Sequence, residues 1–190
     1  MESPERRCAP AQLSFSMKSR VVIAACLLLS GPVLAQSLGE KSGVNATFGI
    51  TPATSDFVRE AAIGDIFEIE SSKLALEKAD QATKDFASQM IADHTKTSKE
   101  LRSIMAGGPK VAIPDALDGT HQSELDKLRT LNGGDFVKTY YDEQVSAHKD
   151  AVSLFERYAK SGDSAKLKSW AATTLPTLQH HLAMAQALDK

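Results

Sequence analysis

The chain has 190 residues, 42% of them hydrophobic and 24% charged, and a formal net charge of −2 with the five histidines counted as neutral. This composition is typical of one globular domain with a buried core, and it offers no basic surface for a phosphate backbone, so we expect no nucleic-acid binding. The chain contains no G-x-x-x-x-G-K-[ST], G-x-G-x-x-G, G-x-S-x-G, H-E-x-x-H or C-x-x-C. The common enzyme signatures are therefore absent, and the sequence leans against an enzyme without excluding one.

Residues 17–35, MKSRVVIAACLLLSGPVLA, have the pattern of a secretory signal peptide. Two basic residues precede an apolar run, and Val33 and Ala35 suit the positions before a signal-peptidase cleavage site. We expect cleavage near Ala35 and a periplasmic or secreted protein. Because the apolar run is shorter than the ~20 residues of a spanning helix, we expect no membrane-spanning segment in the mature chain. We interpret residues 1–16 as an upstream extension and residues 36–53 as a flexible lead-in.

Cys26 leaves a second localisation open. Ile23–Cys26 resembles a bacterial lipobox, so the alternatives are a chain that is lipid-anchored at Cys26 or otherwise associated with the outer membrane. The apolar run continues past this cysteine, which favours cleavage at Ala35. In that case both cysteines of the chain are removed, and the mature domain depends on its core without any disulfide.

Four stretches of the remaining chain show apolar side chains at spacings of three and four, which predicts amphipathic helices. They are residues 55–79, 81–105, 135–160 and 163–189. Helices of about 25 residues extend about 37 Å, a length typical of four-helix bundles. We therefore predict an all-α fold, with a four-helix bundle domain over residues 54–190.

The connections between these helices differ in length. Between the first two helices only Asp80 suggests a helix cap, so one continuous helix is left open. Residues 107–134 separate the second and third helices and include a short helical segment at 120–131. This connection is long enough to run the length of the bundle, as the crossover of ferritin-like folds does, and would make the second and third helices parallel.

One polar side chain falls on the predicted buried stripe of each long helix. These residues are Glu70, His94, His148 and His181, each with apolar residues three, four or seven positions away. Glu68, two residues before Glu70, is placed on a wetter or more closely packed surface. A buried carboxylate costs several kcal/mol unless it is paired, protonated or bound to a metal. We therefore predict that the glutamate and the three imidazoles gather near the middle of the bundle.

Two interpretations of these four residues remain open. Neutral imidazole with carboxylate is a ligand set for a transition metal ion such as Fe, Zn, Cu or Mn, and the pattern does not choose among them. The alternative is a structural network in which the histidines are hydrogen-bonded to neighbouring hydroxyl groups, with no metal. Asp93, adjacent to His94, either supports a ligand or lies in solvent, and we favour solvent.

Four strings occur in order along the chain: FEIESSKLALEKA, FASQMIADHTKTSKEL, YYDEQVSAHKDAVSLFERYA and LPTLQHHLAMAQAL. Together they resemble the bacterial family called domain of unknown function 4142, over about residues 55–188. The resemblance implies an exported, ferritin-like four-helix protein of the periplasm or outer membrane, with no established activity. The Glu-x-x-His pairs of di-iron ferritins are missing, because Ile91, Val145 and Leu178 stand three positions before the histidines, so we expect a mononuclear or otherwise different metal site.

We thus expect an exported helical-bundle protein that binds a metal ion or a small ligand in its core and acts in envelope stress or metal handling. A structural or interaction module with a buried histidine network and no metal is one alternative, and a metal-dependent enzyme is another. The sequence leaves the oligomeric state open, including a homo-oligomer.

Overall fold

The computed structural model describes residues 43–189, so the predicted upstream extension, signal peptide and first part of the lead-in lie outside the described residues. Within this range the secondary structure consists of helices without a strand. The helices are α2 (Val44–Thr47), α3 (Thr54–Lys78), α4 (Gln81–Ala106), α5 (Gly119–Thr130), α6 (Gly133–Ser161) and α7 (Ala165–Leu188). The predicted all-α fold is confirmed, and α2 adds a single helical turn within the segment predicted as a lead-in.

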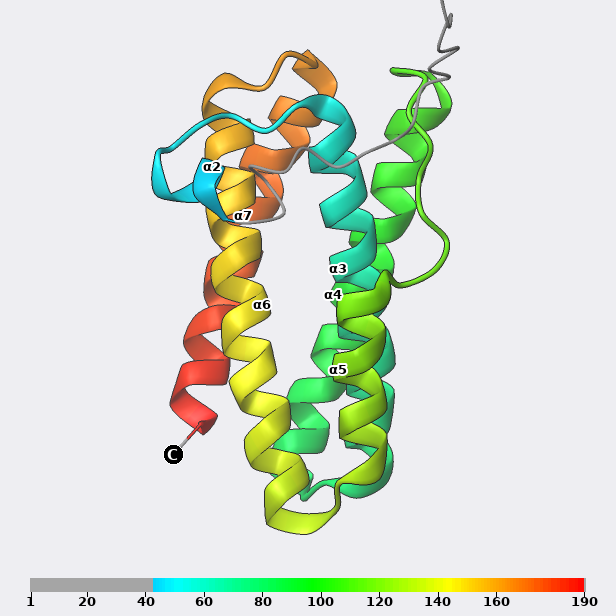
Figure 1. Cartoon of the computed structure of the whole chain (residues 1–190), viewed down its shortest axis with the longest axis vertical. Helices are drawn as coiled ribbons and strands as arrows, with labels where there is room; N and C mark the ends of the chain where they lie inside the picture. The colour runs from blue at the N-terminus through cyan, green and yellow to red at the C-terminus, as the bar shows by residue number, and fades with distance from the viewer. Residues whose placement is uncertain (1–42, 190) are drawn as a thin grey trace, which may run out of the picture. The chain divides into compact units, whose positions relative to one another are not determined.

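The four long helices form a bundle (Figure 1). Helix α3 packs against α4 and α6, and α7 packs against the same two helices, so α3 and α7 lie diagonally across the bundle. The chain runs along α3, returns along α4, and passes through the connection that contains α5 back to the end where α6 begins (Figure 1). Helices α4 and α6 are therefore parallel, and the long connection predicted between the second and third long helices is confirmed.

Helices α3 and α4 are separate. Ala79 and Asp80 have extended backbone angles, which end α3 and reverse the chain. The Asp80 carboxylate accepts a hydrogen bond of 2.9 Å from the backbone N–H of Thr83, so it caps the first turn of α4. The cap that the sequence suggested thus marks a sharp turn, and the alternative of one continuous helix is wrong.

The apolar core consists of two clusters with a polar layer between them. One cluster forms at the end of the bundle where α3 begins and includes Phe57, Tyr158 and Trp170. The other forms at the opposite end and includes Phe86 and Tyr140. Between the clusters, the buried positions of all four long helices carry polar side chains: Asp65, Glu68, Ser71, Ser72, His94, Gln144, His148 and His181. A core interrupted at its middle by buried ionisable groups requires an explanation, because such groups are costly to desolvate.

The short helix α5 covers α3 and α6 on one side of the bundle. Its Leu125 and Leu128 are buried, and its His121 ring packs edge-on against Phe67 of α3, with 5.5 Å between the ring centroids. The Lys78 ammonium donates hydrogen bonds to three carbonyl oxygens at the end of α5, two of them at 2.6 and 2.8 Å. Helix α3 is therefore buried on two faces, one toward the bundle and one toward α5.

The packing of α5 against α6 makes the stability of the fold pH-dependent through Glu143. Burial, together with the charges of Glu124, Asp142 and Glu68 and against the opposing charge of Lys127, raises the pKa of this α6 carboxyl from its usual 4.5 to about 7. A raised pKa means that ionising Glu143 disfavours the folded state, so stability falls as the pH rises from about 4.5 to about 7.

We expect Glu143→Gln to increase the free energy of unfolding at pH 8 by roughly 1 kcal/mol, a value reduced for the partial solvent exposure of the side chain. At pH 4 the two proteins should have equal stability, because Glu143 is protonated in both the folded and the unfolded wild type. Urea unfolding at the two pH values measures the difference. A gain that is the same at both pH values would contradict the assignment to ionisation.

Candidate metal centre

Three histidines from three helices meet in the polar layer. His94 of α4, His148 of α6 and His181 of α7 are each at most 4% exposed, and their ring centroids are 5.4 to 5.5 Å apart. Each ring offers one nitrogen atom as a ligand, and these three nitrogens all lie within 4.8 Å of one another. The sequence prediction that these three side chains point into the bundle and come together is confirmed.

The second nitrogen of each ring has a defined partner. His94 Nδ1 lies 2.8 Å from Asp65 Oδ1, His148 Nδ1 lies 2.9 Å from the backbone oxygen of Gln144, and His181 Nε2 lies 2.9 Å from Asp93 Oδ2. These oxygens only accept hydrogen bonds, so the histidine nitrogen carries the hydrogen in each pair. The tautomer of each neutral ring is thereby fixed, with its remaining nitrogen as a free lone pair.

The remaining nitrogens are His94 Nε2, His148 Nε2 and His181 Nδ1. Within the described part of the chain, none of the three has a hydrogen-bond partner, although all are buried. Metal-ligating histidines typically show this arrangement, with one nitrogen held by a carboxylate or carbonyl and the other aimed at the metal. Buried polar atoms without partners are rare in folded proteins, so three of them converging on one point indicate a site for a ligand.

The environment keeps two of the three rings neutral at pH 7. Burial, followed by the charge of His94, lowers the pKa of His148 to about 3. Burial likewise lowers the pKa of His181 to about 4, against the effect of its hydrogen bond to Asp93. For His94 burial lowers the pKa, but the hydrogen bond and charge of Asp65 outweigh it, so the net direction is upward. Neutral rings are the form that binds a metal ion.

The glutamate buried in the polar layer is Glu68 and not Glu70. Glu68 is 3% exposed, and its Oε1 lies 3.6 Å from His148 Nδ1. Neither of its oxygens accepts a hydrogen bond from the described residues. Glu70 lies toward the outside of α3, where its carboxylate pairs with Lys73 at 2.7 Å. The expectation that Glu70 points into the bundle is therefore wrong.

The error over Glu70 has a physical cause in the two buried faces of α3. Phe67, which lies on the apolar stripe used to place Glu70, packs against His121 of α5 and not in the centre of the bundle. The face toward the other long helices carries small residues such as Ser72 and Ala75, which permit close helix packing. Glu68 lies on this closely packed face, about 200° around the helix from Glu70.

Two acidic residues orient the histidines: Asp65, which sequence reasoning missed, and Asp93, which it named but placed in solvent. The Asp65 carboxylate accepts hydrogen bonds from Thr97 Oγ1 at 2.8 Å and Ser98 Oγ at 3.0 Å, in addition to the one from His94. Asp93 holds His181 across the α4–α7 contact, so our preference for a solvated Asp93 is wrong. For Asp65 the only local signal was its spacing of one helical turn from Glu68, and no pattern within one helix identifies a partner on another.

The donor set fits a transition metal ion. Imidazole nitrogens, which bind a metal ion in the neutral form of the ring, are ligands for Zn, Fe, Mn or Cu. Nitrogens around a tetrahedral zinc ion lie about 3.4 Å apart, given Zn–N distances of about 2.0–2.1 Å. Since the three nitrogens already lie within 4.8 Å of one another, modest side-chain movement would bring them to that spacing. The three histidines come from α4, α6 and α7, so a bound ion would link three helices of the bundle.

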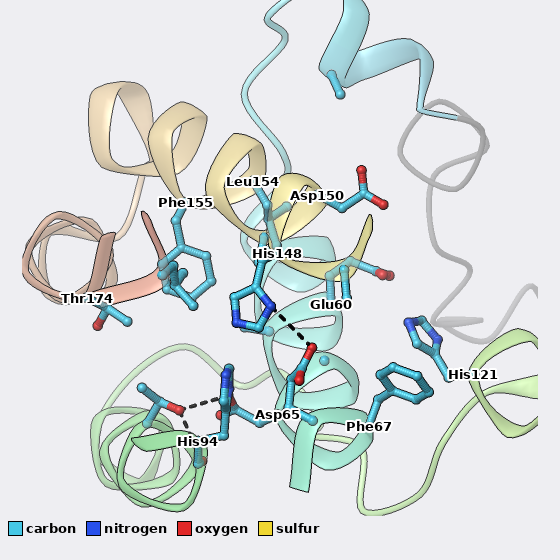
Figure 2. A pocket seen from close by; sticks show the side chains of 18 of the residues that line it. Glu60, Asp65, Phe67, His94, His121, His148, Asp150, Leu154, Phe155 and Thr174 are labelled. Carbon is cyan, nitrogen blue, oxygen red and sulfur yellow. Dashed lines mark hydrogen bonds and ion pairs between the residues drawn. The ribbon is translucent and has the colours of Figure 1, made fainter. Parts of the chain in front are cut away.

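A cavity of about 350 Å³ extends from this centre to the surface beside α5. Its buried end is lined by Glu68, His94 and His148, and its lining continues to the exposed residues Thr120 and Asp150. Figure 2 shows His94 and His148 pointing into this space from two helices, with a dashed line marking the contact between His148 and a carboxylate oxygen. The centre is therefore accessible to small molecules from outside the bundle.

The fold and the site together define a class: a helical bundle whose centre holds three buried histidines that could bind a metal ion. The sequence profile of the family described as Domain of unknown function (DUF4142) matches residues 39–188 of the chain. The chain belongs to this family. Neither the curated proteins nor the solved structures that were compared with it contain a match. The predicted family resemblance is confirmed, and it assigns no activity.

The described helices were also compared with the length and hydropathy that a membrane span requires. Over residues 43–189, none of them is both long enough and apolar enough to cross a bilayer. The expectation of no spanning segment agrees with this finding for the described part of the chain.

Proposed function

We propose that this protein binds one divalent transition metal ion in the middle of its helical bundle. His94, His148 and His181 supply three nitrogen ligands, and Glu68 supplies a carboxylate oxygen. The observation that carries the proposal is the convergence of unpartnered buried atoms. Three imidazole nitrogens and both oxygens of Glu68 lack hydrogen-bond partners among the described residues, and they belong to one polar layer.

A structural histidine network without metal explains these atoms less well. A network that stabilises a core satisfies its buried donors and acceptors, because each unsatisfied one costs about 1–3 kcal/mol. Here each histidine is satisfied on one nitrogen only, and Glu68 on neither oxygen. Burial raises the pKa of Glu68, against the charge of His94, so ionising this carboxyl group is costly at its position.

The signal-peptide pattern of residues 17–35 supports a proposed location outside the cytoplasm. A protein exported to the periplasm or secreted, with a mature chain free of cysteine, would hold a metal through nitrogen and oxygen ligands, as this centre does. We propose a role in metal handling or stress resistance at the cell envelope. A metal-dependent enzyme is the second candidate, favoured by the cavity that reaches the centre from outside.

Metal-dependent stabilisation tests the binding proposal. We expect Zn²⁺ or Co²⁺ at 100 times its dissociation constant to raise the free energy of unfolding by about 2.7 kcal/mol. Chemical unfolding of dialysed protein with and without the added ion measures the change. No change with Zn²⁺, Co²⁺, Mn²⁺, Fe²⁺ or Cu²⁺ would refute the proposal.

Glu68→Leu provides the matched variant for this experiment. Without metal it should be more stable than the wild type by about 1–3 kcal/mol, because it replaces an unsatisfied buried carboxyl group with an apolar side chain. It should also gain less stability from the added ion, because one ligand is missing. Glu70→Leu, two residues away on the exposed side of α3, should show neither effect.

A further inference from the structure

The cavity that leads to the three histidines has features of a binding site in its own right. Its volume of about 350 Å³ falls at the lower end of the range for small-molecule sites. Residues of α3, α4, α5, α6 and α7 line it, together with two residues at α2. A cavity of this size is larger than a metal ion alone would occupy, so it leaves room for a small molecule beside the proposed ion.

The position of the histidines within the cavity wall determines which side of a bound ion is open. His94 and His148 line the buried end of the cavity, whereas His181 does not reach its lining. An ion held by all three nitrogens would thus lie between His181 and the cavity, with one side facing the open space. Glu68, buried and without a hydrogen-bond partner for either oxygen among the described residues, lines the same end.

The charge of the lining favours positively charged ligands. The lining contains one guanidinium group, that of Arg157, and several carboxyl groups. The carboxyl groups belong to Glu60, Asp65, Glu68, Asp118, Glu124 and Asp150. Asp118 is paired with His121 at 2.8 Å. Glu124 and Asp150, near the surface, form no hydrogen bond or ion pair with the residues that the structure describes. A cavity lined by one sign of charge attracts ligands of the opposite sign.

Apolar side chains lie between the charged mouth and the buried end. Phe67 forms one wall beside His121, and Leu154 and Phe155 lie above His148 (Figure 2). From inside to outside, a ligand would therefore meet metal-binding groups, then an apolar wall with aromatic rings, and then the carboxyl groups near the surface. This order defines the chemistry of a complementary ligand.

We propose that the cavity binds a small organic cation, with an uncharged nitrogen donor that occupies an open coordination position of the metal and a positively charged group that lies among the carboxylates of the mouth. This inference rests on the proposed metal centre and adds the class of its exogenous ligand. Glu124 and Asp150 select the charge, and Phe67 and Phe155 contact the apolar middle of the ligand.

Three pyridines of similar size test the proposal on Co²⁺-loaded wild-type protein. They are 4-(aminomethyl)pyridine, 4-ethylpyridine and 4-pyridylacetate, which are cationic, neutral and anionic at pH 7.5. A rigid para-substituted ring places its donor nitrogen and its charge at opposite ends, so it cannot chelate the ion. We expect the binding of each pyridine to change the visible Co²⁺ spectrum. The cation should bind at least about tenfold more tightly than the anion, a difference of about 1.4 kcal/mol in binding free energy.

Two variants separate the parts of this inference. Glu124→Gln with Asp150→Asn, both at partly or fully exposed positions, should retain Co²⁺ and reduce the preference for the cation to about threefold or less. Ala151→Phe places a ring in the cavity and should retain Co²⁺ while losing all three pyridines. If Ala151→Phe does not fold, Thr120→Trp at the exposed mouth replaces it.

The outcomes distinguish this inference from the metal proposal. Failure of the wild type to bind Co²⁺ refutes the metal centre itself. If Co²⁺ binds but no pyridine changes its spectrum, the metal centre stands and the open coordination position is refuted. If the anion binds as tightly as the cation, the proposed ligand class is wrong.

Discussion

A chain that carries both His94→Ala and His148→Ala should retain no metal ion under conditions in which the wild type is loaded. The two side chains supply two of the three nitrogen ligands, and they come from different helices. Binding free energies of about 10–16 kcal/mol for four-ligand zinc sites correspond to roughly 3 kcal/mol per ligand. Loss of two ligands should therefore weaken binding by about 10⁴-fold. Elemental analysis after gel filtration, with a competition titration, measures both quantities.

His180→Ala is the matched control for this experiment. His180 is the neighbour of His181 on α7, but its side chain is exposed. The control removes an imidazole without touching the centre, so its metal content should equal that of the wild type. Circular dichroism should show that both proteins remain helical. Equal metal content in the double variant and the wild type would mean that the ion binds elsewhere on the chain.

Asp65→Ala should weaken both the fold and the metal centre. The substitution removes the acceptor of three hydrogen bonds, from His94, Thr97 and Ser98, and leaves His94 Nδ1 without a partner in the core. We expect a loss of about 3 kcal/mol in the free energy of unfolding of the metal-free protein. Metal affinity should fall about 10- to 100-fold, because Asp65 also fixes the orientation and tautomer of His94.

Comparison with Ser98→Ala separates the two roles of Asp65. Removing the Ser98 hydroxyl deletes one hydrogen bond to the carboxylate but leaves the Asp65–His94 contact in place. This variant should lose about 1 kcal/mol of stability and bind metal like the wild type. If Asp65→Ala loses stability but keeps its full metal affinity, Asp65 supports only the fold and does not orient His94 for metal binding.

The periodic spacing of apolar residues was sufficient to predict the four long helices and the long connection. Those features follow from local sequence, since each amphipathic helix must bury its apolar face. The three histidines could also be placed, because α4, α6 and α7 each have one dominant buried stripe at those positions. Their convergence at one level followed from the parallel arrangement of α4 and α6 that the connection imposes.

Glu68 and Asp65 could not be identified in the same way, and for Asp93 the sequence did not decide between its two alternatives. Helix α3 is buried toward both α5 and the other long helices, so its apolar residues define two faces. The prediction took the face that carries Glu70 as the one that points into the bundle. Which carboxylate faces an imidazole on another helix depends on the rotation of each helix about its axis. Rotation is set by packing between helices, and a single sequence contains little information about it.

The ligand environment of a bound ion gives the most direct test of this centre. X-ray absorption spectra of the wild type loaded with one equivalent of Zn²⁺ should fit nitrogen and oxygen ligands only, at about 2.0–2.1 Å. The outer-shell scattering should correspond to three imidazole rings in the wild type and to two in His181→Ala. A spectrum that fits without imidazole scattering, or is unchanged in His181→Ala, would contradict the three-histidine centre.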